Sequence, residues 1–305
     1  MLSKSEVHVD AALSNISIMY KNAALVAEQV LPVLRVTKES DKHFVYGKEA
    51  FKLPETIRAD GAEANEASLT LSTDSYIVEE HALKDIVTDR ARENADPALQ
   101  LDIDITEFLT DIIMLRLEKS MADLLTSTTK MTKNTTLSGT SQWSDYTNSV
   151  PLSNIKTAKA SVRQNIGREA NTIILGGDVA ETLSLHPEIK DLRKHVDPSL
   201  LTDAGLPPKI LGLKVVEAKA VENTAYAGLT ESMNYIFGKN TVICYVAPSL
   251  GRRTLSLGTT IRVNKRQVRR WREEARKGDM IEVSDLFTCK LIADVAGYLI
   301  AGTIA

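Results

Sequence analysis

The chain has 305 residues, of which 43% are hydrophobic and 25% charged, and its formal net charge is −3. This composition supplies enough apolar residues for two compact cores and too many for a disordered chain, and the small net charge excludes a general attraction to nucleic acid or anionic membranes. The N-terminus lacks a basic start followed by an apolar stretch, and no run of about 18 apolar residues occurs, so we expect neither a secreted nor a membrane-spanning protein.

Residues 1–36 mix polar and apolar side chains without a regular period, and an apolar run surrounds Pro32. A segment this apolar without a period of its own usually packs on something else. We therefore interpret 1–36 as an N-terminal arm that packs on a neighbouring subunit. The alternative is an ordinary N-terminal strand of the same subunit.

Residues 37–90 contain two stretches in which polar and apolar residues alternate, at 43–53 and 68–78, separated by a turn-rich tip at 54–67. This pattern predicts two long strands joined as a ribbon. Because an isolated two-stranded ribbon is only marginally stable in water, we expect it to lie against another surface. A hairpin that folds back on its own domain is the alternative.

Residues 97–127 are predicted to form one long helix. Pro97 after Asp96 is typical of a helix start, and apolar residues recur at helical spacing in two stripes. The stripes are Leu101, Ile105, Phe108, Ile112, Leu115 and Leu109, Ile113, Leu117, Met121, Leu124. At 1.5 Å per residue such a helix is roughly 45 Å long.

The sequence then predicts a helix, a buried strand and a second helix in close succession. We expect Ser153 to cap a helix that begins at Ile155, and Gly167 to end it. A strand at 171–175 follows, and Asp178 is expected to cap the next, short helix.

The rest of the chain is expected to consist mostly of strands joined by loops and tight turns, which makes the fold class α+β. Cys244 and Cys289 lie in apolar, strand-like stretches and are interpreted as small buried side chains in a reducing compartment, with a disulfide as the less favoured alternative. The expected strands are 210–217, 235–246, 260–263, 267–273, 280–286, 287–293 and 297–304, with a turn at 277–279.

No set of residues in the sequence favours a catalytic or ligand-binding site over an ordinary structural role. The sequence Gly176-Gly177-Asp178 follows a strand but lacks the spacing of a phosphate-binding loop. The five histidines are scattered without metal-ligand spacing, and no G-x-S-x-G is present. We therefore expect no enzyme, no catalytic residues, no cofactor and no metal.

Three successive segments resemble the axial domain of tailed-bacteriophage major capsid proteins with the HK97 fold: PLSNIKTAKASVRQNIG, NTIILGGDVAETL and LHPEIKDLRKHV. Other segments resemble further parts of this family. QVLPVLRV resembles its proline-containing entry into the shell, ETIRADGAEANE the tip of its extended loop, and RKGDMIEV with Trp271 its peripheral sheet. Trp143 matches the tryptophan that precedes the first axial helix.

The resemblance implies an HK97-like capsid fold in five parts. These are the N-terminal arm at 1–36, an extended β-hairpin loop (the E-loop) at 37–90, a peripheral domain at 91–150 and 251–305, its long spine helix at 97–127, and an axial domain at 151–250. The implied function is that of a structural major capsid protein that self-assembles into pentamers and hexamers of an icosahedral phage head around double-stranded DNA. An encapsulin-type compartment shell is the alternative, and a mixed α/β enzyme is disfavoured.

The resemblance also implies partners. A separate scaffolding protein is expected because the chain lacks the long, charged, helical N-terminal extension of some family members, and a portal protein and a decoration protein are further candidates. Assembly is expected in the bacterial host cytoplasm, with no membrane involved. Lys48, Lys52 and Asn264 cannot be assigned to the covalent cross-link that some members form, so a non-covalent shell is expected.

Two sets of residues are candidates for contacts in the assembled particle. The first set, expected between subunits, is Tyr20, Leu31, Pro32, Phe44, Tyr46, Phe51, Arg58 and Glu63. The second lies in the basic stretch 262–277 and consists of Arg266, Arg269, Arg270 and Arg272. These arginines could contact DNA phosphates without reading sequence. We favour the alternative that they lie on a solvated strand face or pair with acids of a neighbour.

Overall fold

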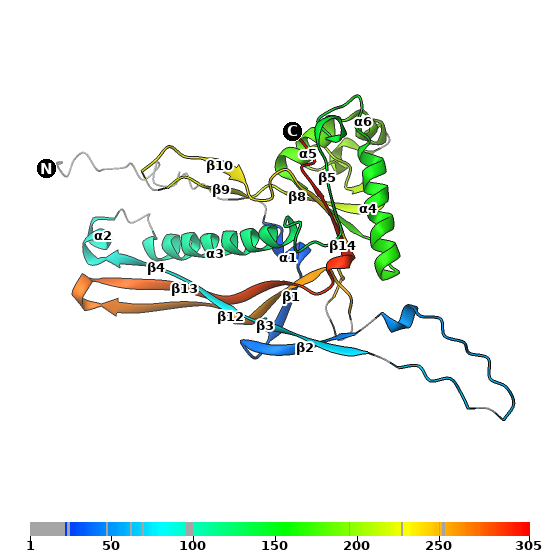
Figure 1. Ribbon diagram of the computed structural model, residues 1–305. Coiled ribbons are helices and arrows are strands. Elements are labelled where there is room, and N and C mark those ends of the chain that lie inside the picture. The colour runs from blue at the N-terminus through cyan, green and yellow to red at the C-terminus, as the bar shows by residue number, and fades with distance from the viewer. Residues whose placement is uncertain are drawn as a thin grey trace.

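The computed structural model describes residues 22, 25–46, 48–61, 63–68, 70–95, 100–194, 196–226, 228–249, 251 and 254–305. Two sheets organise the fold: a four-stranded sheet beneath one long helix, and a six-stranded sheet flanked by shorter helices (Figure 1). A thin two-stranded ribbon projects away from both. This mixture of segregated helices and largely antiparallel strands is the expected α+β class.

The four-stranded sheet has the order β1-β12-β13-β4. The strands are β1 (Val33–Val36), β12 (Gly258–Glu273), β13 (Gly278–Leu291) and β4 (Glu79–Thr88). Only β1 runs parallel to its neighbour; the other pairs are antiparallel. The expected breaks at 264–266 and 286–287 do not divide these strands. At 264–266 the structure has a β-bulge between Val263 and Gln267, with Asn264 at φ 62°. A bulge accommodates an extra residue without ending the strand, so β12 continues.

The long helix α3 (Leu101–Leu125) covers one face of this sheet (Figure 1). Its buried stripe includes Leu109, Ile113, Leu117 and Met121, as helical spacing predicts. The helix was expected over 97–127, of which 97–99 lie outside the described residues. A short helix, α2 (Asp89–Asn94), precedes it, and the Thr88 hydroxyl caps α2 by accepting the N–H of Ala91 at 3.2 Å.

The six-stranded sheet has the order β5-β14-β11-β6-β8-β7. Its strands are β5 (Asn134–Thr136), β14 (Gly297–Ala301), β11 (Thr241–Cys244), β6 (Thr172–Gly176), β8 (Leu213–Ala218) and β7 (Lys209–Ile210). The helices beside it are α4 (Pro151–Ile166), α5 (Gly177–Leu185) and α6 (Pro187–Arg193). Every residue of β6 is buried, which explains its uninterrupted apolar sequence.

Both expected N-caps in this region are wrong. Helix α4 already begins at Pro151, with Val150 as N-cap and no side-chain cap, because proline is well suited to the first helical turn. Helix α5 has Gly176 as N-cap, and Asp178 lies in its first turn. Gly167 does end α4, in the left-handed conformation at φ 66°.

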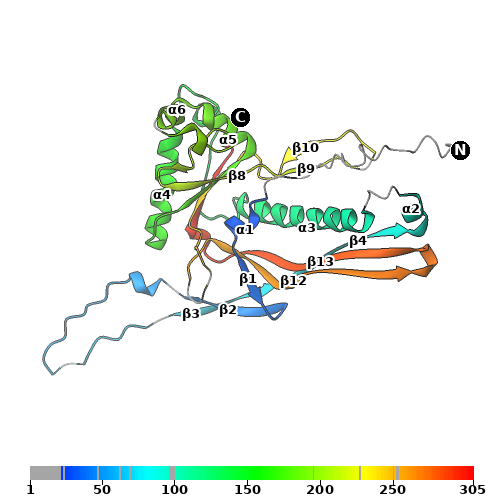
Figure 2. The same cartoon turned by 180° about the vertical axis from the view of Figure 1, so that it is seen from behind.

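A small hairpin, β9 (Val221–Asn223) and β10 (Met233–Tyr235), leaves the six-stranded sheet and extends above α3 (Figures 1 and 2). The expected strand 235–246 is therefore two strands, β10 and β11, separated by a turn at Gly238 with φ 59°. Four 3-10 helices lie in connections, and a fifth lies in the ribbon: η2 (Gly139–Ser141), η3 (Pro198–Leu200), η4 (Glu274–Arg276), η5 (Asp294–Ala296) and η1 (Glu49–Phe51).

The described part of the expected arm packs inside its own subunit. Helix α1 (Ala27–Val30) and Leu31 are in the main core, and Val30 and Leu31 are fully buried. The chain continues as β1, which pairs with β12. The interpretation as an arm on a neighbour is thus wrong for α1 and Leu31, whose apolar side chains belong to the subunit's own core, whereas Leu34 of β1 is 37% exposed. Residues 1–21, 23 and 24 lie outside the described residues.

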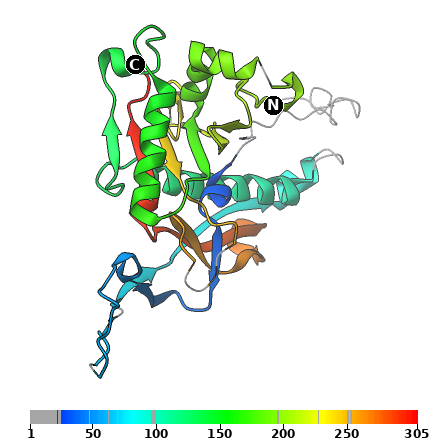
Figure 3. The same cartoon turned by 90° about the vertical axis from the view of Figure 1, so that its right-hand side faces the viewer.

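The ribbon consists of β2 (Ser40–Tyr46) paired with β3 (Leu71–Ile77). Both strands are shorter than the expected 43–53 and 68–78 legs. Residues 79–88 form β4 and belong to the four-stranded sheet, so the expected E-loop at 37–90 extends too far at its C-terminal end. The tip of the ribbon stands apart from the rest of the chain in two perpendicular views (Figures 1 and 3), whereas Phe51 before the tip lies against Gly167 at the end of α4.

Candidate assembly surfaces

The tip of the ribbon is the most exposed part of the described chain. Every described residue from 52 to 70 is exposed, and the side chains of Leu53 and Ile57 are 97% and 81% exposed. Four acids and one arginine accompany them: Glu55, Asp60, Glu63, Glu66 and Arg58. Apolar and acidic groups together on an extended segment indicate a surface that another protein can cover.

The root of the ribbon is fixed to the four-stranded sheet. Lys290 of β13 pairs with Asp74 of β3 at 2.7 Å and also donates to the carbonyl of Ser75. The hydrogen bond from Lys290 lowers the pKa of the Asp74 carboxyl below its usual value. His43 lies opposite, with its Nε2 3.9 Å from an Asp74 oxygen. The ribbon is therefore anchored at its base while its tip is unsupported.

The candidate inter-subunit residues are in different environments. Phe51, Arg58 and Glu63 lie on the exposed part of the ribbon, where the Phe51 side chain is 65% exposed. Pro32 is half-buried. Leu31 is wrong as a contact, because its side chain is fully buried in its own core.

Three further candidates cannot be placed. Tyr20 lies outside the described residues, as do the side chains of Phe44 and Tyr46, whose backbones lie in β2.

Arg262 and Arg266 form a partly buried charge cluster beside the β12 bulge. Both guanidinium groups flank the Asp285 carboxylate, at 3.2 Å and 3.3 Å, and Arg262 also pairs with Glu28 of α1 at 3.0 Å. Asp285 is only 1% exposed. Arg266 is therefore an ion-pair partner within the subunit, and because its side chain is 26% exposed, its contact with DNA or a neighbour stays a prediction.

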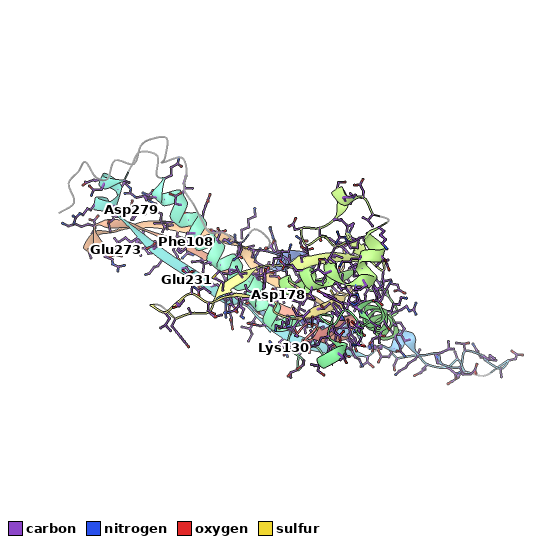
Figure 4. The ribbon with its side chains drawn as sticks, turned by 90° about the horizontal axis from the view of Figure 1, so that it is seen from above. Phe108, Lys130, Asp178, Glu231, Glu273 and Asp279 are labelled. Atoms are coloured by element: carbon purple, nitrogen blue, oxygen red, sulfur yellow. The ribbon has the colours of Figure 1, made fainter. Side chains whose placement is uncertain are left out.

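Arg270 and Arg272 belong to a second cluster at the far end of the sheet. Arg270 pairs with Asp102 at 3.0 Å and Asp279 at 2.6 Å, and Arg272 makes a two-pronged contact with Asp89. Figure 4 shows Asp279 at this end of the molecule, near Glu273. The contact with Arg272 lowers the pKa of Asp89, and that with Arg270 lowers the pKa of Asp279.

Acids of the same chain pair with Arg270 and Arg272, whose side chains remain 52% and 39% exposed, so their contact with acids of a neighbour stays a prediction. Arg92 adds to the cluster through Asp102 and Asp279, both at 3.0 Å. Arg269, the remaining one of the four arginines, donates to the neutral Gln267 at 3.1 Å. The ion pairs with Asp279, Asp89 and Asp102 could not be predicted from the sequence, because these three acids come from β13, α2 and α3.

Cys244, Cys289 and His186 are titratable side chains inside the subunit. Burial raises the pKa of the Cys244 thiol to about 12 and that of Cys289 to about 11, and both cysteines are free. His186, whose pKa is lowered by burial, caps α6 by accepting the N–H of Glu188 on Nδ1 at 3.2 Å. These groups have structural roles, and the described residues contain no group of three or more acids, histidines or cysteines placed to hold a metal ion.

A cavity of about 220 Å³ lies between α3 and the paired strands β4 and β13. Its lining includes Arg116, Lys130, Glu79 and Asp123, so both signs of charge are present. His81 stacks on Phe287 there, with ring centroids 4.2 Å apart. The lining also contains Cys289, and burial raises the pKa of its thiol, which disfavours the thiolate that a nucleophilic cysteine needs. In the described part of the chain, no helix combines the length and apolar character needed to cross a membrane.

Comparison with known proteins identifies relatives among phages. No protein-family model matches the chain. The chain is 32% identical over 309 residues to the major capsid protein of Burkholderia phage BcepMu, covering 99% of this chain and 98% of that protein. It is 29% identical over 225 residues to the major capsid protein of Pseudomonas phage JBD67, covering 72% of this chain and 69% of that protein.

Solved structures share the fold. A phage-related protein from Bordetella bronchiseptica RB50 superposes with a TM-score of 0.71 at 23% identity, covering 97% of both chains. The capsid of cyanophage P-SCSP1u gives a TM-score of 0.70 at 8% identity, covering 97% of this chain and 93% of that chain. Mycobacterium phage Che8 gives 0.64 at 15% identity, covering 98% of each.

A sheet crossed by one long helix, a second sheet with flanking helices, and a projecting ribbon together define the HK97-like capsid fold. The chain belongs to the family of phage major capsid proteins. It is a structural protein of the phage head, and the relatives support this function and not the encapsulin alternative.

Proposed function

We propose that the chain assembles with copies of itself into pentamers and hexamers, which form an icosahedral head around double-stranded DNA. The observation that carries this proposal is the exposed ribbon tip, with Leu53 at 97% and Ile57 at 81% exposure. Apolar side chains held out in water gain stability only when another surface covers them. A tip that covers a different part of the next copy makes a heterologous contact, the type that closes into rings.

We assign a role in the shell to each of the expected domains. The E-loop, 37–90 with its sheet strand excluded, lies over an adjacent subunit. The peripheral domain, 91–150 and 251–305, carries the spine helix, and the axial domain, 151–250, faces the capsomer centre. The arm at 1–36 contacts neighbours through the residues before its buried root and through the half-buried Pro32.

Phe51, Arg58 and Glu63 are the proposed contact residues of the E-loop, with Pro32 at the arm root, and Tyr20, Phe44 and Tyr46 as further candidates. The exposure of Phe51, Arg58 and Glu63 supports their role as contact residues. Any contact with packaged DNA is proposed to be non-specific and to involve Arg269, which donates to the neutral Gln267, in preference to Arg266, Arg270 or Arg272, which pair with acids.

The proposed partners beyond the chain itself are a separate scaffolding protein, a portal protein and a decoration protein. Assembly is proposed to take place in the host cytoplasm, without catalytic activity or a cofactor. The supporting argument for the non-enzymatic role is the membership of a structural family.

The test is a double substitution at the tip, Leu53→Asp with Ile57→Asp. Both side chains are exposed in the subunit, so folding measured by circular dichroism should be unchanged, while electron microscopy should show no shells. The matched control is Thr56→Asp, which adds charge to the same exposed segment without removing an apolar contact. Shells at the normal yield from the double variant would contradict the proposal.

A further inference from the structure

Three segments that are far apart in the sequence meet at one end of α3. They are Asn22 with residues 25–27, the α3 residues Glu118 and Lys119, and the start of β9 at 221–222. Figure 1 shows α1 and the β9–β10 hairpin beside the same helix. We call this meeting point the arm joint.

Glu118 joins α3 to the arm. One oxygen of its carboxylate, Oε2, accepts the backbone N–H of Val26 at 2.9 Å and of Ala27 at 2.8 Å. The Glu118 side chain is only 2% exposed. Burial raises the pKa of its carboxyl, and the two N–H donors act in the opposite direction.

Lys119, the next residue of α3, joins the helix to the hairpin. Its ammonium donates to Glu222 of β9 at 2.7 Å and lies 3.5 Å from Asp123. The Lys119 side chain is 32% exposed and that of Glu222 26%, so this pair is partly shielded from solvent.

Asn22 joins the arm directly to the hairpin. Its side-chain amide donates to the carbonyl of Val221 at 3.1 Å and accepts the N–H of Val221 at 3.0 Å. Both backbone groups of Val221 are therefore satisfied by the arm, as they would be by a neighbouring strand. Each of the three segments is thus bonded to the other two.

This geometry has an energetic consequence. If Asn22 and residues 25–27 leave, the buried Glu118 carboxyl loses both donors and Val221 loses both partners. Unsatisfied buried polar groups are costly, so the arm root and the hairpin stabilise each other through α3.

We propose that the arm joint couples the N-terminal arm to the β9–β10 hairpin, so that a seated arm root holds the hairpin over α3 and a displaced root releases it. The hairpin carries exposed apolar side chains, Tyr226 at 84%, Leu229 at 68% and Met233 at 58%. A partner that pulls on the arm therefore changes the presentation of this apolar surface. The coupling is a property of the single subunit and does not depend on the proposed shell.

Residues 31–36, which follow the arm joint, are anchored to β12 by contacts of their own. The proposal therefore concerns only the residues before them. The hydroxyl of Thr259 donates to the carbonyl of Pro32 at 2.7 Å, that of Thr260 donates to Leu31 at 3.1 Å, and β1 pairs with β12. Loss of the arm joint should therefore loosen Asn22 and residues 25–27, while Glu28, which pairs with Arg262, the buried Val30 and β1 stay in place.

The experiment is hydrogen exchange with mass spectrometry on the purified full-length chain, comparing Asn22→Ala with the parent. Asn22 is half-buried at the edge, so its removal does not open the core. The expected result is exchange about tenfold faster both at Val26 and Ala27 and in residues 221–235, with β1 and β12 unchanged. Unchanged exchange at Val26 and Ala27 would overturn the coupling.

Glu118→Ala tests the same joint from the helix side, with Glu107→Gln as a control on an exposed glutamate of α3. Faster exchange of the hairpin, which is joined to α3 through Lys119, supports the proposal. Faster exchange confined to residues 25–30 contradicts it. If Glu118→Ala loosens the whole sheet, Asn22→Ala alone decides.

Discussion

Neighbouring apolar residues on α3 have different environments. Leu117 is 1% exposed and faces the sheet, whereas Ile112 is 37% exposed on the other side of the helix. Helical spacing places both residues in apolar stripes, and only the position of the sheet shows which stripe is covered. The sequence alone therefore identifies the helix better than it identifies its buried face.

The pair yields a stability prediction. Leu117→Asp buries a charge against β13 and should cost several kcal/mol of unfolding free energy, leaving little folded subunit. Ile112→Asp, on the exposed stripe, should cost well under half as much. Urea unfolding followed by circular dichroism measures both, and equal losses would show that the two stripes are equally packed.

His81 yields a pH prediction. Burial, with a contribution from the Arg116 charge, lowers its pKa below the ordinary value of 6.5. The unfolded chain then binds more protons than the folded chain just below pH 6.5, so this contribution is complete above 6.5 and is lost as the pH falls. His81→Phe, which can retain the stacking on Phe287, should reduce the fall in melting temperature between neutral and acid pH. An identical fall in parent and variant would contradict this.

At the scale of elements, the chain's local signals predicted most helices and strands but not their irregularities. Gly167 ended α4 as expected because a left-handed cap favours glycine. The sequence did not predict the bulge at Asn264, because pairing with β13 keeps the strand extended through its polar residues. It did not predict the start of α4 at Pro151, because proline favours the first turn of a helix. The ion pairs at the end of the sheet were missed because Asp89 and Asp102 come from distant segments.

Those ion pairs yield a prediction for one end of β12 and β13. Arg272→Met removes the two-pronged contact with Asp89 and should increase hydrogen exchange at the β12–β13 turn, more so at low salt. The matched control is Arg269→Met on the same strand, since Arg269 contacts the neutral Gln267. Equal effects of the two variants would show that the cluster does not stabilise the turn.

The same cluster should respond to acid. Because the pKa values of Asp89 and Asp279 are lowered in the folded chain, their contribution is present above the unfolded carboxyl range and is lost as the pH falls through the folded values. Exchange at the turn should therefore rise on acidification in the parent and rise less in Arg272→Met, after correction for intrinsic exchange. An equal rise in the parent and in Arg272→Met would show that the ionisation of Asp89 and Asp279 does not stabilise the turn.

At the scale of the whole molecule, an apolar segment can be satisfied by its own core or by a neighbour, and the sequence does not distinguish them. Residues 25–36 use their own core, through Val30, Leu31 and β1. The ribbon tip at 52–70 does not, and its described residues are all exposed. Only the fold shows which of the two segments has apolar side chains left for another copy.

A non-covalent shell is a whole-particle prediction. Lys48 and Lys52 are exposed on the ribbon, where an ordinary lysine is protonated and a poor nucleophile. Assembled particles boiled in SDS with reductant should give one band near 33.5 kDa. A ladder of multiples would show that subunits are cross-linked.

The most direct test of the central claim is a cryo-electron microscopy reconstruction of particles formed by the full-length chain, with scaffolding protein if assembly requires it. The account predicts closed shells of pentamers and hexamers in which Leu53 and Ile57 of each ribbon are covered by an adjacent subunit. Shells in which the tip folds back on its own subunit, or in which Leu53 and Ile57 stay exposed to solvent, would contradict it.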